Sequence, residues 1–163
     1  DPKLGTAPRM TVAENMLLAS KRGEKRHLMP RRLKQRMAEF TKLAAQMNNG
    51  LENRMATATG ALSGGQRQAL SFLMATLKRP DILLLDEHTA ALDPHTARNL
   101  LHATNQRITE DHLTALMITH HMEDALKYGN RLIVLKDGQI KADYNAAEKA
   151  QLTVDDLYAY FEM

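Results

Sequence analysis

The first part of the chain places apolar residues with the period of an α-helix. Five of them recur at steps of four, three, four and three: Leu33, Met37, Phe40, Ala44 and Met47. This spacing puts them on one face, so we predict a helix over about residues 30–47 that packs this face into a core. Pro30 suits its first position, and the Asn-Asn-Gly of residues 48–50 suits a left-handed turn at its end.

Two further helices are predicted from capping signals. Thr11 and Glu14 have the spacing of a capping box, which predicts a helix to about Ser20. Its apolar side consists of Val12, Met16 and Leu17. Ser63 and Gln66 repeat the spacing and predict a helix to about Arg79. Its wide apolar face consists of Ala69, Leu70, Leu73, Met74 and Leu77. Residues 21–27 are expected to be a polar loop, and residues 51–62 are expected to be irregular.

The second half alternates apolar runs with helical patterns. Residues 81–86 form a nearly all-apolar run that is too short for a helix, which is typical of a strand buried on both faces of a parallel sheet. A second strand is predicted over residues 113–119, and a hairpin over residues 131–143 turns at Asp137 and Gly138. Helices are predicted over residues 94–109, 122–128, 146–151 and 154–161. This order predicts an α/β fold with an added helical layer.

Two short segments carry candidate chemistry. Residues 62–68, Leu-Ser-Gly-Gly-Gln-Arg-Gln, form a glycine-bearing turn that opens a helix, where backbone N–H groups without helical partners suit a phosphate. Asp86 and Glu87 lie at the C-terminal end of the first predicted strand. One carboxylate can hold Mg²⁺ and the other can orient or deprotonate a water. Taken alone, the two segments are better explained as a helix cap and as a strand end that meets solvent.

In their order along the chain, these segments resemble the nucleotide-binding subunit of ABC transporters. Residues 62–68 resemble the family's signature motif, and residues 82–86 its Walker B strand. Ala91-Leu92-Asp93 resembles the D-loop, and Thr119-His120 resembles the switch-histidine segment. Residues 1–15 resemble the segment that follows the Q-loop. The resemblance covers nearly the whole chain.

The resemblance implies a fold and a division of the chain. It implies an α/β fold that is the C-terminal part of a P-loop NTPase (RecA-like) parallel sheet with an α-helical subdomain. Residues 1–79 would form the helical subdomain, including the signature helix. Residues 80–163 would form the C-terminal half of the ATPase core.

The resemblance also implies roles for the acidic residues and the histidine. Asp86 would contact Mg²⁺, directly or through water, and Glu87 would act as the catalytic base or polarise the attacking water. His120 would contact the γ-phosphate and that water, although a single histidine after a strand is more often structural. A metal site made by residues 120–124 is not predicted. Two histidines that bind a metal from one helix face are four residues apart, whereas His120 and His121 are adjacent.

The remaining candidate residues bind nucleotide or couple sites. By resemblance, Ser63, Gly64 and Gly65 would face the γ-phosphate of a nucleotide held by the opposite subunit. Gln66, also a candidate nucleotide-binding residue, would either reach the ribose or close the capping box. Asp93 would help to couple two sites, and its place before Pro94 equally predicts a helix N-cap. Two positions depart from the Glu-Pro-Thr-Ser that the family often has after its Walker B strand: His88 replaces Pro, and Ala90 replaces a hydroxyl residue.

Composition narrows the class of protein. The 163 residues contain no cysteine, so disulfides and thiolate metal sites are excluded. Aromatic residues make up 4%, which argues against base-stacking nucleic-acid modules. Residues 1–50 hold 11 Lys and Arg against 4 Asp and Glu, whereas residues 51–163 hold 11 against 15. The basic excess indicates a solvated face or, alternatively, contact with a membrane surface or a partner near it.

One expected motif is missing from these residues. No G-x-x-x-x-G-K-[ST] phosphate loop occurs in the 163 residues. We therefore expect a fragment of a longer subunit that neither binds ATP tightly nor hydrolyses it alone; a naturally short, degenerate protein is the alternative. Without the neighbouring strand, an apolar sheet edge would be exposed, and we expect self-association or strand exchange through it.

The function implied by the resemblance is ATP hydrolysis coupled to transport. The cofactors would be ATP and Mg²⁺, and the partners a second copy in a head-to-tail dimer and transmembrane permease subunits, with no nucleic acid. The location would be peripheral, on the cytoplasmic face of a membrane. Two alternatives remain: a non-enzymatic regulatory or docking module, and half of a DNA-repair or chromosome ATPase. Intact Glu87 and His120 oppose the first, and the lack of sustained heptads opposes the second.

Overall fold

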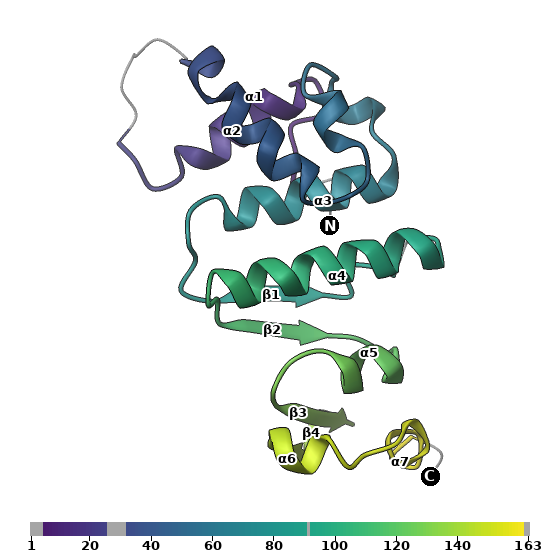
Figure 1. Cartoon of the computed structure of the whole chain (residues 1–163). Helices are drawn as coiled ribbons and strands as arrows, with labels where there is room; N and C mark the ends of the chain where they lie inside the picture. The colour runs from purple at the N-terminus through teal and green to yellow at the C-terminus, as the bar shows by residue number, and fades with distance from the viewer. Residues whose placement is uncertain (1–4, 26–31, 91, 162–163) are drawn as a thin grey trace. The chain divides into compact units, whose positions relative to one another are not determined.

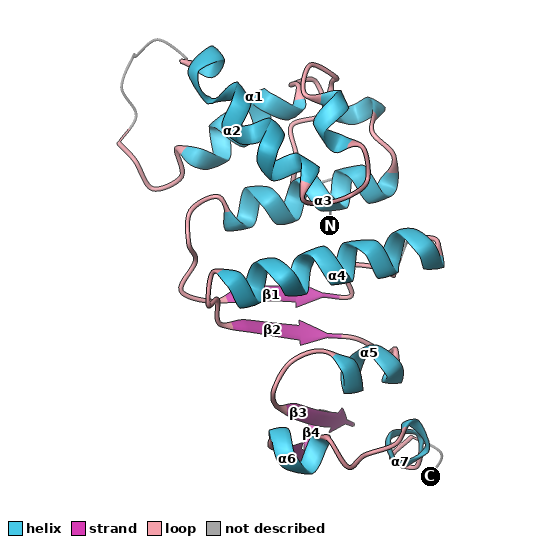
Figure 2. Ribbon diagram, viewed as in Figure 1, coloured by secondary structure: helices cyan, strands magenta, loops and turns pink. Residues whose placement is uncertain are grey.

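The computed structural model describes residues 5–25, 32–90 and 92–161 as a mixed α/β chain (Figures 1 and 2). Pro30, Ala91 of the predicted D-loop, residues 1–4 of the opening segment and residues 26–27 of the predicted polar loop lie outside the described residues. The chain divides into two compact units, residues 1–116 and 117–163. These units reflect contacts within the chain, whereas the predicted boundary after residue 79 separates two subdomains of the family; that boundary stays a prediction.

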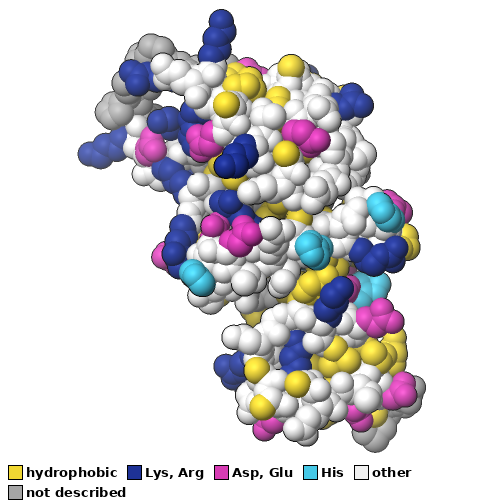
Figure 3. All heavy atoms as spheres, in the orientation of Figure 1, with side chains coloured by type: hydrophobic (Ala, Val, Ile, Leu, Met, Phe, Trp, Pro, Cys, Tyr) yellow, Lys and Arg dark blue, Asp and Glu magenta, His cyan; other side chains and the backbone are white. Residues whose placement is uncertain are grey.

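Three helices form a layer in the first unit. They are α1 (Val12–Ser20), α2 (Leu33–Ala45) and α3 (Gly64–Thr76). The predicted capping box of α1 is confirmed: the Glu14 N–H donates to the Thr11 hydroxyl (3.2 Å), and the Thr11 N–H donates to the Glu14 carboxylate (2.9 Å). The irregular stretch between α2 and α3 contains two 3₁₀ turns, Leu51–Arg54 and Thr59–Ala61. In Figure 3 many dark-blue Lys and Arg side chains lie over this layer, most densely at the left of the view.

The helical layer closes its own core. Its fully buried large side chains are Val12, Met16, Phe40, Met47, Leu51, Leu70 and Leu73. The predicted stripe of α2 is confirmed at its C-terminal end, where Phe40 and Ala44 are buried, whereas Leu33 and Met37 are half-buried. The left-handed turn after the helix is also confirmed, because Asn48 and Gly50 both have positive φ.

A buried amide ties the opening segment to this core. Asn15 is fully buried, and its side-chain amide donates to the carbonyls of Ala7, Met10 and Thr11. Its carbonyl oxygen accepts the Ala7 N–H at 2.8 Å. These bonds satisfy the buried amide, as burial requires, and tie the segment before α1 to the start of that helix.

The strand predicted to be buried on both faces has one open face. β1 (Leu83–Asp86) pairs with β2 (Ala115–Ile118) in a two-stranded sheet. Leu83 and Leu85 are buried, but Leu84 is 66% exposed and Ile82, just before the strand, is 53% exposed. The prediction of burial on both faces is therefore wrong: within the part of the chain that the structure describes, nothing covers the second face. The helix α4 (Pro94–Glu110) connects β1 and β2 along the chain, and its bounds are close to the predicted ones.

The second unit is built around a hairpin. Its elements are α5 (Met122–Lys127), β3 (Leu132–Lys136), β4 (Gln139–Tyr144), α6 (Ala146–Lys149) and α7 (Val154–Tyr158). Asp137 and Gly138 both have positive φ between the paired residues Lys136 and Gln139, which confirms the predicted turn. The buried ammonium of Lys149 donates to the carbonyls of Tyr128 and Gly129, and burial lowers its pKa.

Candidate functional site

The turn that opens α3 is held by a complete capping box. The Gln66 N–H donates to the Ser63 hydroxyl (3.2 Å), and the Ser63 N–H donates to the Gln66 side-chain oxygen (3.3 Å). The Gln66 side-chain nitrogen donates to the Asn49 carbonyl (3.2 Å), which ties the turn to the loop after α2. The structural explanation of Gln66 as the closing residue of the box is thereby confirmed.

The two glycines of this turn have different surroundings. A Cβ on Gly65 would lie 2.4 Å from the γ-methyl of Thr96 on α4, so only glycine fits there without displacement. A Cβ on Gly64 would meet Leu92 at an ordinary 3.6 Å, and Gly64 is exposed. Within the described ranges, the N–H groups of Gly64 and Gly65 donate no hydrogen bond. Gly65 therefore allows close packing of α3 on α4, while Gly64 is exposed at the start of α3. A phosphate contact at Gly64 stays a prediction.

Asp93 caps the helix that packs against this turn. Its carboxylate accepts the N–H groups of His95 (3.1 Å) and Thr96 (3.0 Å), which confirms the predicted N-cap of α4. Hydrogen bonds from the Thr96 side chain, and then from backbone N–H groups, lower the pKa of Asp93. The role of Asp93 in coupling two sites stays a prediction.

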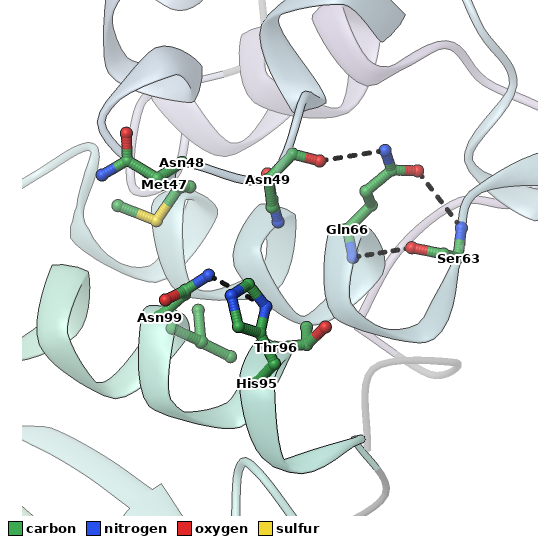
Figure 4. Close-up of a pocket in the computed structure, with 9 residues that line it drawn as sticks. Met47, Asn48, Asn49, Ser63, Gln66, His95, Thr96 and Asn99 are labelled. Carbon is green, nitrogen blue, oxygen red and sulfur yellow. Dashed lines mark hydrogen bonds between the residues drawn. The ribbon is translucent and has the colours of Figure 1, made fainter.

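A pocket of about 230 Å³ lies between the starts of α3 and α4 and is lined by polar and apolar side chains. Figure 4 shows the amide and hydroxyl groups of Asn49, Ser63 and Gln66 on one side and His95 with Asn99 on the other. The side-chain nitrogen of Asn99 lies 3.4 Å from Nδ1 of His95. His95 and Asn99 were not predicted from the sequence as site residues. Their spacing of four residues on the helix after the predicted D-loop could have indicated that they share one face.

The acidic pair lies at the end of β1. Asp86 is the last residue of the strand, and both carboxylate residues are exposed. Glu87 has a φ of 42°, a left-handed conformation that costs energy for a residue with a side chain. The Ala90 N–H donates to the Glu87 carbonyl (3.0 Å), and this turn holds the strained residue in place.

The chemistry of this pair fits a shared magnesium site. In the described residues no group of three or more His, Asp or Glu could hold a metal by itself. Mg²⁺ typically takes one or two carboxylates and completes its shell with waters and phosphate oxygens. An exposed Asp86 suits that arrangement, in which a nucleotide supplies the other ligands.

His120 belongs to the second unit. It is exposed, and its ring lies 4.3 Å from the ring of His121. The Thr119 hydroxyl accepts the His121 N–H (3.1 Å), which shapes the turn between β2 and α5. Since Glu87 belongs to the first unit, the meeting of Glu87 and His120 around one phosphate stays a prediction.

The chain is similar to many proteins of one family. The ABC transporter family profile matches residues 3–90. The tyrosine transport ATP-binding protein of Clostridioides difficile is 41% identical over 162 residues, which are 99% of this chain and 64% of that protein. The thiamine import ATP-binding protein of Escherichia coli K12 is 34% identical over 80% of this chain and 53% of that protein. The chain thus spans between half and two thirds of the length of these relatives.

Solved structures agree with the sequence matches. The dimeric post-hydrolysis structure of the ATP-binding cassette MJ0796 with ADP and Pi superposes with a TM-score of 0.68 at 26% identity, covering 86% of this chain and 59% of that one. A second dimeric structure of this cassette gives a TM-score of 0.67 at 29% identity. No helix among the described residues has the length and apolar character needed to cross a bilayer. The expected resemblance and the P-loop NTPase fold are confirmed, and the chain belongs to the ABC transporter family.

Proposed function

We propose that this chain is the helical layer and the C-terminal half of the nucleotide-binding core of an ABC transporter ATPase. The observation that carries the proposal is the close packing of the α3 and α4 starts at Gly65 and Thr96. It leaves the N–H of Gly64 exposed beside the Ser63 hydroxyl, at the positive end of a helix dipole. Such a start attracts a phosphate group.

The nucleotide that this turn contacts would be bound by another subunit. These 163 residues contain no phosphate loop to cradle a triphosphate. The related cassette was solved as a dimer. We propose that two subunits pair head to tail, so that Ser63 and Gly64 complete a site whose phosphate loop belongs to the partner.

The acidic pair and the histidine would serve the nucleotide bound by their own subunit. Asp86 would help to hold Mg²⁺, and Glu87 would orient or deprotonate the attacking water. His120 would contact the γ-phosphate. The support for this grouping is that Glu87 and His120 each follow one strand of the β1–β2 pair, and ligands of parallel sheets gather at the strand ends.

The transport process would be the uptake of a small organic solute. Relatives are named for tyrosine transport, thiamine import and phosphonates import. Because those solutes differ while the ATPase parts are similar, the permease would select the solute. The subunit would then lie at the cytoplasmic face, bound to that permease.

A complementation assay tests the proposed role of the signature turn. The full-length tyrosine-transport relative would carry an arginine in place of its own signature serine, so that its dimers cannot hydrolyse ATP. Addition of this chain should restore phosphate release, because Ser63 and Gly64 complete the relative's site. The same chain with Ser63→Arg is the matched control and should restore nothing.

The outcomes separate the proposed role from a docking role. Restoration that survives Ser63→Arg would contradict a role for the signature turn. A complex that forms in sedimentation velocity but restores no hydrolysis would favour a non-enzymatic docking module.

A further inference from the structure

Basic residues and one exposed leucine lie where α1 ends and near the end of α3. We name this group the basic corner, and it consists of Leu18, Lys21, Arg22, Lys25 and Lys78. Leu18 is 57% exposed, although it lies on a helix whose other face is buried. Lys21, Arg22 and Lys25 are exposed as well.

The corner is ordered by contacts between two segments far apart in sequence. The guanidinium of Arg22 donates to the Ala75 carbonyl (3.2 Å) near the end of α3. In return, the ammonium of Lys78 donates to the Arg22 carbonyl (2.9 Å). These bonds fix the turn after α1 against the end of the signature helix.

One carboxylate lies among these cations. Glu24 accepts hydrogen bonds from Lys21 (3.0 Å) and Lys78 (2.9 Å), and these two contacts lower the pKa of Glu24. Four positive side chains and one negative side chain leave the corner with a net charge of +3 at neutral pH. Because Glu24 is shared by Lys21 and Lys78, its single negative charge offsets only part of the positive charge of the corner.

The leucine and two of the cations share a face. Leu18, Lys21 and Arg22 are spaced at i, i+3 and i+4, and backbone bonds from Lys21 to Leu18 and from Arg22 to Ala19 extend the helical turn through them. An exposed apolar side chain flanked by cations matches a surface that inserts between lipid headgroups and attracts anionic ones.

We propose that the basic corner docks on an anionic lipid surface. Two observations favour lipid over nucleic acid. The corner offers an exposed leucine to the acyl boundary, and it contains no aromatic side chain on which a base would stack. No residue of the basic corner belongs to the candidate ATP site, so the two proposals can fail separately.

Vesicle co-sedimentation of the full chain tests the proposal. Vesicles of phosphatidylcholine with 30% phosphatidylglycerol would be compared with pure phosphatidylcholine at low and at physiological salt. The chain should bind the anionic vesicles and bind them less at higher salt. Each lysine removed should weaken binding about fivefold, so Lys25→Gln should lose about fivefold and Lys21→Gln with Lys25→Gln about 25-fold. Leu18→Ser should lower binding at both salt concentrations.

Matched variants show whether the corner is responsible. Lys141→Gln removes an exposed lysine from the second unit and should bind like the unaltered chain. Ser63→Arg should also keep vesicle binding, which separates this result from the complementation assay.

Three results would overturn the proposal. They are equal binding to neutral and anionic vesicles, a loss with Lys141→Gln as large as with Lys25→Gln, and tighter binding of a 20-base oligonucleotide than of anionic vesicles at the same salt.

Discussion

The helical layer and the β1–β2 sheet differ in how completely this chain covers them. Phe40, Met16 and Leu70 are fully buried among α1, α2 and α3. In the sheet, Leu84 and Leu116 remain 66% and 49% exposed. Apolar burial is the dominant stabilising term in folding, so the buried side chains of the helical layer should contribute more to stability than those on the open face of the sheet. Asp86, the candidate Mg²⁺ ligand, ends a strand of this less covered sheet, and Glu87, the candidate catalytic base, follows it directly.

The largest expected difference between these regions is in core truncations. Phe40→Ala should lower the free energy of unfolding by about 3–5 kcal/mol, because it removes a fully buried ring and leaves a cavity. Leu84→Ala removes a mostly exposed side chain and should cost less than about 0.5 kcal/mol. Urea unfolding followed by circular dichroism measures both. Equal losses would show that the sheet face is covered in solution.

The signature turn offers a comparison at adjacent positions. Gly65→Ala should destabilise the chain by about 1–3 kcal/mol, because its methyl group would overlap the γ-methyl of Thr96. Gly64→Ala adds the same methyl group at an ordinary distance and should be nearly neutral. The same urea titration compares the two. If both variants were equally stable, close packing of α3 on α4 would not explain Gly65.

The open sheet face should drive self-association. Ile82, Leu84 and Leu116 expose apolar surface that a second copy can bury. Leu84→Lys should weaken association about tenfold or more, roughly 1.4 kcal/mol, because a charge would lose its water at the contact. Light scattering over a concentration series measures this. A monomeric unaltered chain at high concentration would contradict the expectation.

The smallest expected effect is an acid-dependent change at the α4 cap. Because the folded-state pKa of Asp93 lies below its ordinary 3.8, the cap contributes fully above that value and loses its contribution as the pH falls through the lowered pKa. Asp93→Asn keeps a capping side chain that does not titrate, so it should reduce this acid slope while nearly preserving stability at pH 7. Asp93→Ala should lose stability at both pH values. An unchanged slope in Asp93→Asn would assign the acid sensitivity to other carboxylates.

Local signals predicted the local structure well. The capping boxes at Thr11 and Ser63, the Asp93 cap and the Asp137-Gly138 turn were all readable, because each depends on residues within four positions of one another. Helix ends differ from the predicted ones by up to three residues, because the last turns of helices fray or tighten.

Features that depend on distant segments were not predictable in the same way. The exposure of Leu84 depends on what covers the sheet, and an apolar run carries no such information. The fit of Gly65 against Thr96, and the pocket between Asn49 and His95, depend on three segments packing together. The positive φ of Glu87 was likewise not predictable from the sequence, because glutamate rarely adopts this conformation.

The most direct test of the central claim is equilibrium dialysis of the unaltered chain alone against labelled ATP with Mg²⁺. The claim is that Ser63 and Gly64 contact the phosphates of a nucleotide that another subunit binds. The account therefore predicts no saturable binding at micromolar ATP. Saturable micromolar binding by these 163 residues alone would contradict it.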